Sequence, residues 1–459
     1  MGTGALLDAA AFAVREISLF AATGFLLLGA SDLAVDLIWI GVRLRRALLR
    51  AAPAWATTLA PPAEPGRLAV FVPAWDEGAV IGRMLAHALR TFDDSDFRIY
   101  VGCYPNDPAT AQAVRALGDP RVRLVIGPLD GPTTKADCLN SLWRQMVADE
   151  AAEGRAFKAV VLHDAEDVVH SAELKLFDSL TERFDLVQLP VLPLIDPASR
   201  WIAGHYADEF AESHGKELVV RQALGAALPS AGVGCAVRRD ALGELAAANG
   251  GLPFDPASLT EDYELGLKLR ALGRRATFVR MPATPGGAVI ATREHFPATI
   301  RDAVNQKSRW MAGIALAGWD RLGWSGGLAE RWMRLRDRQS LLAALVLCAS
   351  YLALLMTAPL ASAAALAGHE VELVTPALAM MMTIALLLLA WRLGMRFGFV
   401  AYHYGWLEGL RSIPRIVVGN AVAILAARRA LGRYRSSRRN GAAVWGKTRH
   451  VFPTEVPAE

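Results

Sequence analysis

The sequence is poor in cysteine, and its few thiols follow no pattern. Only four cysteines occur among 459 residues. They form no Cys-x-x-Cys pair and no other spacing typical of a metal site. A disulfide framework is therefore not expected, and we predict reduced thiols in a cytosolic or membrane setting. The four are Cys103, Cys138, Cys235 and Cys348.

The chain also lacks a large excess of charge of either sign. Its 49 Lys and Arg against 45 Asp and Glu leave a net charge of +4 at pH 7. This is not the concentrated basic surface of nucleic-acid-binding proteins, so no nucleic-acid partner is expected. Hydrophobic residues make up 53% of the chain and the mean hydropathy is +0.27, yet 20% of the residues are charged. These values predict a protein that is globular in one part and membrane-spanning in another.

The first long apolar segment covers residues 16–42 and predicts a transmembrane helix. It is too long for the core of a signal peptide, and no small-residue cleavage site follows it. Asp32 and Asp36 share one face of this helix, and we expect them to face protein or water rather than lipid. Arginines are frequent just after the segment and rare before it. Residues 1–15 should therefore lie on the outer side of the membrane and the chain after residue 42 in the cytoplasm.

A basic and Pro/Ala-rich linker at residues 43–65 leads into a region with a different pattern. Between residues 66 and 320, short apolar runs such as 67–73 and 159–162 alternate with helical patterns. Alternation of this kind is typical of an α/β domain with a mostly parallel sheet. We therefore predict one cytoplasmic α/β domain over residues 66–320.

Two apolar runs nearer the C-terminus predict transmembrane helices at residues 339–367 and 375–395. A basic, amphipathic stretch at 321–338 precedes the pair and arginines follow it, so both of its ends should be cytoplasmic. A shorter apolar run at 408–430 has arginines at both ends. We favour an interfacial or re-entrant helix there over another crossing, followed by a cytoplasmic tail at 431–459.

Acidic residues follow the first two expected strands. Asp76 and Glu77 come just after the strand that ends at Pro73, and Asp107 follows the next strand. Ligands of open α/β sheets bind at the carboxyl ends of the strands, so these acids are candidates to bind substrate. The alternatives are an exposed loop for the first two and a helix-capping turn for Asp107.

A lysine begins the motif Lys135-Ala-Asp-Cys-Leu-Asn140, near the start of an expected helix. Its positive charge opposes the helix dipole, so a negative group should lie close to it. A phosphate of a bound substrate would meet this need, and a solvated lysine is the alternative.

The strongest local signal is His163-Asp164-Ala165-Glu166-Asp167, which follows an apolar strand directly. Crowded carboxylates repel one another unless a cation offsets their charge. Hard oxygen ligands suit Mg²⁺ or Mn²⁺, and either ion can hold a diphosphate. We predict a metal site formed by Asp164, Glu166 and Asp167, with an acidic turn as the alternative.

Two more motifs lie later in the expected domain. Thr260-Glu261-Asp262 begins a helix, where acids are favourable for the dipole and one can also act as general base to a hydroxyl. The second motif places Gln306 and Trp310 four residues apart on a helix, with Arg309 beside them. An indole stacks on sugars, and Arg and Gln bind phosphates or hydroxyls. An interface helix with Trp310 at the lipid headgroups explains the second motif equally well.

In order and spacing, these motifs resemble those of the inverting family 2 glycosyltransferases, which include cellulose and hyaluronan synthases. The likeness covers about residues 66–320, and the Thr-Glu-Asp and Gln-x-x-Arg-Trp motifs are its most specific parts. PAWDE, YPNDPAT, HDAED and the stretch GKTRH at 446–450 further resemble inner-membrane glycosyltransferases of the bacteriophage adsorption protein B type. The resemblance implies a GT-A type nucleotide-sugar-binding domain with transmembrane helices.

The resemblance also implies roles for these residues. Asp262 would deprotonate the acceptor hydroxyl, with Mg²⁺ or Mn²⁺ at the diphosphate of a UDP-sugar. Gln306, Arg309 and Trp310 would hold the acceptor end and the diphosphate. The other residues expected to contact substrate are Asp76, Glu77, Asp107, Lys135, Asp164 and Glu261.

The expected function is extension of an exported polysaccharide from a UDP-sugar, an N-acetylhexosamine, in the bacterial inner membrane. The alternatives are addition of one sugar to a polyprenyl-phosphate lipid, and a membrane scaffold or phage-receptor component with a decayed transferase fold. Few transmembrane helices are expected, so export would need an outer-membrane or periplasmic partner. Because the sequence ends soon after Phe452, a cyclic-dinucleotide regulator would be a separate protein.

The sequence also departs from the family pattern at one position. Glu166 stands where the pattern has a second aspartate, so Asp167 is expected to share the metal or take over that role.

Overall fold

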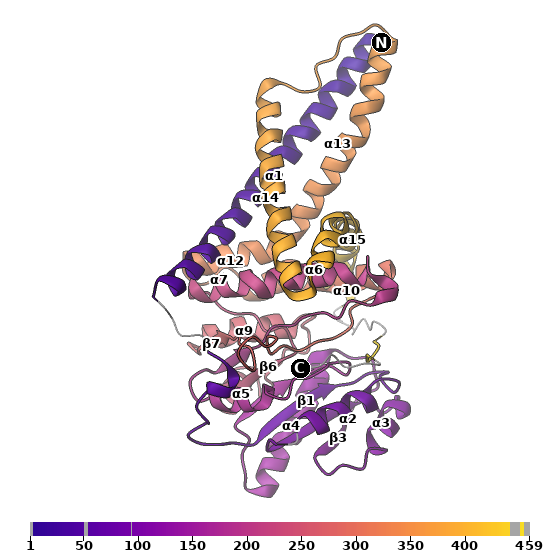
Figure 1. Ribbon diagram of the computed structural model, residues 1–459. Coiled ribbons are helices and arrows are strands. Elements are labelled where there is room, and N and C mark those ends of the chain that lie inside the picture. Colours follow the sequence, from indigo (N-terminus) through magenta and orange to yellow (C-terminus); the bar gives the residue numbers. More distant parts are fainter. Residues whose placement is uncertain (1–2, 50–53, 93, 441–449, 454–459) are drawn as a thin grey trace.

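The chain folds into a globular part and a bundle of long helices that projects from it (Figure 1). The computed structural model describes residues 3–49, 54–92, 94–440 and 450–453. The globular part holds all seven strands found in these residues, and the long helices come from both ends of the chain.

The seven strands form one sheet with the order β3-β2-β1-β4-β6-β5-β7. All neighbours are parallel except β6, which is antiparallel to both β4 and β5. The prediction of an α/β fold with a mostly parallel sheet is confirmed. Because β1, β2 and β4 are parallel neighbours, the residues that follow them meet at one edge of the sheet. The strands are β1 (Leu68–Pro73), β2 (Phe97–Cys103), β3 (Val122–Ile126), β4 (Ala159–Leu162), β5 (Leu186–Gln188), β6 (Cys235–Arg238) and β7 (Ala276–Phe278).

Helices cover both faces of the sheet, so its strands are apolar on both sides. Along β1, Val70 points into one core and packs in the same cluster as Met84 of α2. Its neighbour Phe71 points into the other core, together with Leu142 of α4. The first core holds α2 (Ile81–Thr91), α3 (Pro108–Arg115) and α5 (Glu173–Leu180), and the second holds α4 (Lys135–Glu153), α8 (Arg239–Ala248) and α9 (Glu261–Ala271).

A layer of shorter helices lies between the sheet and the long helices (Figure 1). Two of its helical runs are interrupted by π-helical turns, η3 (Ser213–Glu217) and η4 (Ala312–Ala317). The helices of this layer are α6 (Ala203–Glu212), α7 (Leu218–Ala223), α10 (Ile300–Met311), α11 (Gly318–Leu322) and α12 (Leu328–Arg338).

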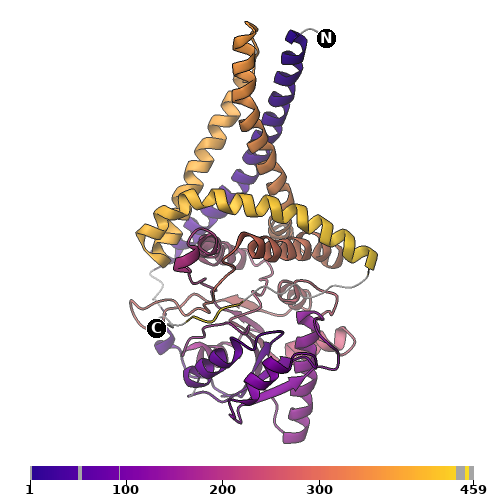
Figure 2. The ribbon, with the colours of Figure 1, turned by 90° about the vertical axis from the view of Figure 1, so that its right-hand side faces the viewer.

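Four helices in the described part of the chain are long and apolar enough to cross a membrane. Helices α1 (Thr3–Leu48), α13 (Ser340–Leu366) and α14 (Pro376–Tyr404) extend away from the sheet (Figure 1). The fourth, α15 (Trp406–Asn440), instead lies across the base of these three (Figure 2). Helix α15 therefore runs in a different direction from α1, α13 and α14.

The helix ends differ from those expected from the sequence. Helix α1 already begins at Thr3 and continues to Leu48, so it includes most of residues 1–15 and the start of the linker. Helices α14 and α15 likewise run on to Tyr404 and Asn440. The reason is that an apolar pattern marks the part of a helix suited to lipid. Good helix formers such as Ala, Leu and Arg extend the helix beyond it.

The two aspartates of α1 face protein, as expected. Asp36 is 2% exposed and forms an ion pair with Lys216 of η3, with 2.6 Å between Oδ1 and Nζ. Lys216 also pairs with Glu212 at 3.2 Å, and Glu212 pairs with Arg396 of α14 at 2.7 Å. Asp32 pairs with Arg336 of α12 at 3.0 Å. These pairs connect α1 and α14 to the helices above the sheet.

A buried arginine fixes α15 to α6. Arg415 is 1% exposed, and its Nη2 donates to Oδ1 of Asp208 at 2.8 Å. Its Nη1 donates to Glu408 at 2.9 Å and to the carbonyl of Arg200 at 3.1 Å. Burial raises the pKa of Asp208 to about 7, and Arg415 opposes that shift. Removal of the guanidinium would leave a buried carboxyl without its cation.

We expect Arg415→Leu to destabilise the protein by about 3 kcal/mol, because one partner of a buried ion pair is lost. The measurement is the melting temperature in detergent micelles. The matched control is Arg428→Leu, which removes an exposed arginine from the same helix. Equal melting temperatures for the two variants would contradict the structural role of Arg415.

Candidate active site

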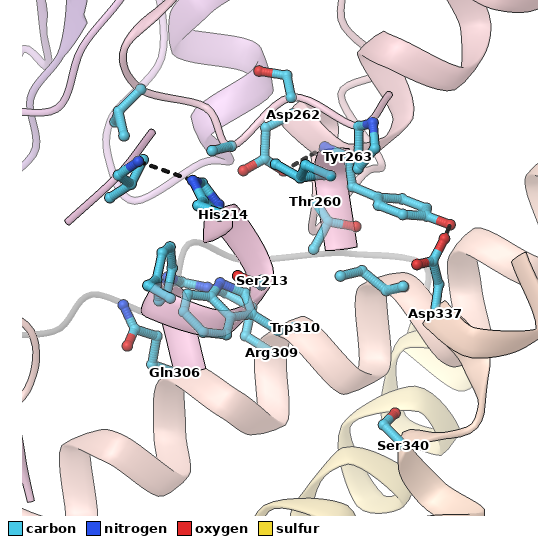
Figure 3. Close-up of a pocket in the computed structure, with 18 of the residues that line it drawn as sticks. Ser213, His214, Thr260, Asp262, Tyr263, Gln306, Arg309, Trp310, Asp337 and Ser340 are labelled. Atoms are coloured by element: carbon cyan, nitrogen blue, oxygen red, sulfur yellow. Dashed lines mark hydrogen bonds between the residues drawn. The ribbon is translucent and has the colours of Figure 1, made fainter. Parts of the chain in front are cut away.

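A cavity of about 600 Å³ lies at the carboxyl ends of the parallel strands. One end is bounded by the loops after β1 and β4, and another by the long helices. Figure 3 shows residues from α9, α10, η3 and α12 around it. The wall nearest the long helices includes Leu28 and Val35 of α1, Ala343 of α13 and Arg392 of α14. The cavity therefore reaches from the sheet edge to the candidate membrane helices.

Two glutamates and a histidine form a compact group at the sheet end of the cavity. Nδ1 of His450 is 2.7 Å from Oε1 of Glu77 and 3.2 Å from Oε2 of Glu166. One ligand atom from each residue lies within 4.8 Å of the other two, which suits a metal ion. Burial disfavours the charged imidazole, but Glu166 and Glu77 outweigh it and raise the pKa of His450 to about 9. Burial raises the pKa of Glu166 to about 8.

The described end of the chain carries His450 into this group. Phe452 is 4% exposed and packs in the core that contains β1 and α2. Its ring lies 6.0 Å from that of His87. The sequence indicated 446–450 only as part of a resemblance, and His450 was not predicted as a site residue. Residues 446–449 lie outside the described part of the chain.

Asp164 and Lys135 lie beside the group and pair with each other. Nζ of Lys135 is 2.6 Å from Oδ1 of Asp164. Lys135 begins α4, whose N-cap Thr134 accepts a hydrogen bond from the backbone of Asp137 at 3.2 Å. Burial lowers the pKa of the lysine, but the nearby acids, Asp164 first among them, raise it well above its usual value. The negative group expected near Lys135 is therefore Asp164 in this structure.

Asp167 points away from the cavity. Its Oδ2 lies 2.7 Å from Nδ1 of His163 and accepts from the backbone of Asp164 at 3.1 Å. The other ring nitrogen of His163 lies 2.7 Å from Glu173. Burial disfavours a charged His163, but the two carboxylates raise its pKa to about 10. The structure thus brings Asp164 and Glu166 to the cavity and uses Asp167 to hold the loop between them.

Asp107 caps a helix instead of lining the cavity. Its Oδ1 accepts from the backbone of Thr110 at 3.3 Å, and its Oδ2 accepts from the backbone of Asp76 at 2.6 Å. Asp76 has a left-handed backbone with φ of 55° and an exposed side chain. The backbone of the next residue, Glu77, donates to Oγ1 of Thr110 at 2.9 Å. Asp76 and Asp107 therefore shape the loop that aims Glu77 at His450.

Asp262 lies at the start of α9 and reaches the centre of the cavity (Figure 3). Its Oδ1 accepts from the backbone of Tyr263 at 2.7 Å. A Cβ at Gly232 would lie 2.7 Å from Oδ2, so glycine is needed there to admit the carboxylate. Burial raises the pKa of Asp262, although Lys135 opposes the shift. Burial and Asp262 also raise the pKa of Glu261 to about 7.

Gln306, Arg309 and Trp310 lie on one helical turn of α10 and all line the cavity (Figure 3). Trp310 packs edge-on against Phe296, with 6.4 Å between the ring centroids. The structure therefore brings the two later sequence motifs to one cavity. Polar cavity residues that the sequence did not indicate include Ser213, His214, Glu294, Asp337 and His450.

Glu294 is an additional buried acid beside the carboxylate cluster. It is 9% exposed, and burial raises its pKa well above the usual value, with further repulsion from Asp167 and Glu166. It comes from a loop between β7 and α10 that has no recognisable motif. Only the folded chain shows that it lies in the cavity.

Comparison with known families identifies residues 65–313 as a match to the glycosyltransferase like family 2. The chain is 35% identical over 473 aligned positions to bacteriophage adsorption protein B of Escherichia coli strain K12. The same identity relates it to bacteriophage N4 adsorption protein B of Escherichia coli O157:H7. Both alignments cover 96% of this chain and 63% of the relative, so the chain spans less than two thirds of the curated relatives. The resemblance found in the motifs is confirmed.

Solved structures give weaker likenesses. A mannosyltransferase from Pyrobaculum calidifontis in complex with GDP-Man and Mn²⁺ has a TM-score of 0.47 and 19% identity, over 93% of this chain and 99% of that chain. A glucosyl-3-phosphoglycerate synthase from Mycobacterium tuberculosis in complex with Mn²⁺, UDP and phosphoglyceric acid has a TM-score of 0.36 and 17% identity. That match covers 60% of this chain and 86% of the synthase.

Proposed function

Because the chain belongs to the glycosyltransferase like family 2, we propose that it is a membrane-bound enzyme that extends an exported polysaccharide. The donor would be a UDP-sugar, an N-acetylhexosamine. One observation carries the proposal. Asp262, Trp310 and the group around His450 line a single cavity whose far wall is formed by candidate membrane helices. A sugar donor and an acceptor at the membrane would meet in such a cavity.

The residues at the sheet end fit a divalent metal ion. Glu77, Glu166 and His450 offer two carboxylates and one imidazole, and Asp164 lies beside them. Oxygen ligands suit Mg²⁺ or Mn²⁺, and Mn²⁺ also accepts imidazole. We propose this set in place of Asp164, Glu166 and Asp167, because the Asp167 carboxylate pairs with His163. A bound ion would neutralise the charge that develops on the departing nucleoside diphosphate.

Asp262 is proposed as the general base of an inverting displacement. Its carboxylate takes the proton of the acceptor hydroxyl as the new bond forms between that oxygen and the anomeric carbon. The bond between the anomeric carbon and the phosphate oxygen breaks on the opposite side, and the diphosphate leaves. A raised pKa makes Asp262 a stronger base than an exposed aspartate, while Lys135 keeps part of it ionised.

Gln306, Arg309 and Trp310 are proposed to hold the acceptor sugar and the diphosphate. The indole offers a face for a pyranose ring, and Arg309 offers a fork of donors for phosphate oxygens. Glu261 and Lys135 would contact the donor, and Asp76 and Asp107 would support the loop on its nucleoside side. The roles of Glu261 and Lys135 follow from their positions in the cavity wall, and those of Asp76 and Asp107 follow from their hydrogen bonds within the loop.

We propose three membrane crossings, with the globular domain on the cytoplasmic side of the bacterial inner membrane. Glu77 and His450 are in contact, so an even number of crossings must separate them. Helices α13 and α14 supply two, and a crossing by α15 would leave His450 on the wrong side. The direction of α15 in Figure 2 supports an interfacial position for it.

One observation favours a second candidate function. The cavity wall near the long helices includes the apolar side chains Leu28, Val35 and Ala343. Such a wall suits the lipid part of a polyprenyl-phosphate acceptor, to which the enzyme would add a single sugar. Export of a polymer would instead require an outer-membrane or periplasmic partner.

Incubation of purified membranes with a panel of nucleotide sugars tests the proposal. We expect a UDP-N-acetylhexosamine to give a ladder of saccharides when products are separated by size. A single lipid-linked sugar would instead establish the second function. The absence of transfer from every donor, with the protein folded and in the membrane, would contradict both functions.

A further inference from the structure

One wall of the cavity is built on a π-helical turn. The turn η3 (Ser213–Glu217) joins α6 to α7 and places Ser213, His214 and Glu217 on the cavity surface. Insertions of this kind are rare within helices and are frequent at functional sites, because they turn side chains out of the regular helical register. No sequence motif marks this turn, and the proposed reaction assigns it no role.

The hydrogen bonds of His214 fix its tautomer. The backbone of Val191 donates to Nδ1 at 2.9 Å, so the proton of the neutral ring lies on Nε2. His214 is 7% exposed and lines the cavity, and no partner for Nε2 is recorded among the described residues. Burial, helped by Arg280, lowers the pKa of His214 to about 3. At neutral pH the ring therefore offers the cavity one N–H donor and no charge.

Two aromatic rings pack against the imidazole of His214. The ring of Phe210 lies 5.1 Å from that of His214, and the ring of Phe278 lies 5.8 Å from it. Phe210 in turn lies 6.3 Å from Trp310, the residue proposed to stack on the acceptor sugar. Figure 3 shows His214, Trp310 and Asp262 around the same cavity. His214 and the proposed stacking platform thus lie beside the same ring, that of Phe210.

The chemistry of this wall distinguishes between sugar substituents. A hydroxyl needs an acceptor for its own proton, and aromatic rings supply only a weak one. An acetamido group presents a carbonyl oxygen that only accepts and a methyl group that needs no polar partner. One N–H donor among aromatic rings therefore matches an acetamido group better than it matches a hydroxyl.

We propose that His214 recognises the acetamido group of the acceptor sugar, with Nε2–H donating to the carbonyl oxygen and the methyl group lying against Phe210. The proposal rests on the proposed function and adds to it a residue that determines acceptor specificity. His214 takes no part in proton transfer. Its contribution is to favour an N-acetylated saccharide end over one without the acyl group.

The test uses saccharides made by the wild-type enzyme itself, purified and offered back as acceptors. Half of the material is chemically de-N-acetylated, which gives a matched acceptor pair. The variant is His214→Phe, which keeps an aromatic ring and removes the N–H. The conservative variant is His214→Gln, whose amide N–H lies near the position of Nε2. The control is His205→Phe, the same change at a buried histidine of α6 that does not line the cavity.

We expect His214→Phe to raise KM for the acetylated acceptor about tenfold, because the variant loses one net hydrogen bond to that acceptor. KM for the de-N-acetylated acceptor, kcat and hydrolysis of the donor by water should stay unchanged. His214→Gln should recover part of the loss, and His205→Phe should show none. Comparing both acceptors in each protein cancels any general effect of the substitution.

An equal change in KM for both acceptors in His214→Phe would overturn the proposal, even if the protein folds normally. Failure of wild-type membranes to transfer sugar would instead reject the proposed function. The two failures are therefore distinguished by the wild-type control.

Discussion

Replacing Asp262 with asparagine is expected to lower the rate of sugar transfer by at least about 10²–10⁴-fold, the usual contribution of a general base. The amide matches the carboxylate in size, so the contact with Gly232 and the fold of α9 should persist. Thermal stabilisation by UDP should remain, because the residues proposed to hold the nucleotide and its metal ion are unchanged. Transfer rates and melting temperatures with and without UDP measure the two effects.

The pH dependence of transfer provides an independent check on the base. Burial raises the pKa of Asp262, so the carboxylate should become protonated, and activity should fall, at a higher pH than for an exposed aspartate. The acidic limb of the wild-type profile should therefore lie above the usual range of an aspartate. A matched control is Asp240→Asn, an exposed aspartate on α8. Wild-type turnover in Asp262→Asn would remove Asp262 from the mechanism.

The second large effect concerns the metal group. His450→Ala and Glu166→Gln are each expected to weaken Mn²⁺ binding by at least about 10–100-fold. That range is typical of mutations in residues that only orient metal ligands, and the loss of a ligand itself should have at least as large an effect. Titration of transfer activity with Mn²⁺ and of UDP-dependent stabilisation with Mn²⁺ gives two readouts of the same affinity. Chelation of the ion should abolish transfer by the wild-type protein and be reversed by adding Mn²⁺.

Two control variants distinguish a residue that binds the metal ion from one that only lies near it. His87→Ala removes a histidine that packs near Phe452 without joining the group, and it should leave the Mn²⁺ titration unchanged. Asp167→Asn keeps the shape of the loop and tests the set expected from sequence. If Asp167→Asn weakens Mn²⁺ binding as strongly as Glu166→Gln, while His450→Ala has no effect, the sequence-based set is right and the geometric set is wrong.

The sequence predicts the parts of the site that are contiguous in the chain. Lys135 and Asp262 begin helices, and Asp164 follows a strand. Parallel strands bring such positions to one edge. The Gln306–Trp310 motif forms a single turn within α10. Local spacing does not tell which of several adjacent acids faces the cavity. Asp167 turns inward because His163 provides a buried partner, and His163 is itself held by Glu173 of the next helix.

Residues that long-range packing brings to the site leave no local signal in the sequence. His214 needs a π-helical turn and the backbone of Val191, and neither leaves a periodic pattern in the sequence. His450 needs the docking of Phe452 into a core built by residues near β1. The sequence leaves open whether Asp107 binds substrate or caps a helix, and the hydrogen bond from the backbone of Thr110 favours the cap.

In the membrane helices, too, the sequence predicts local features but not long-range partners. Hydropathy finds the apolar stretches, and Asp36 is correctly expected to face protein, but its partner Lys216 follows no pattern that hydropathy detects. The ends of α1 and α15 are set by helix formers beyond the apolar part.

The contact between Glu77 and His450 also orders the events of biosynthesis. The two residues are 373 positions apart, and α13, α14 and α15 lie between them. The sheet and helices α13, α14 and α15 are therefore all synthesised before His450 is added to the chain. Under the metal site proposed above, a chain that stops short of His450 would hold the ion with Glu77 and Glu166 alone. Sugar transfer would then begin only after the long helices have been made.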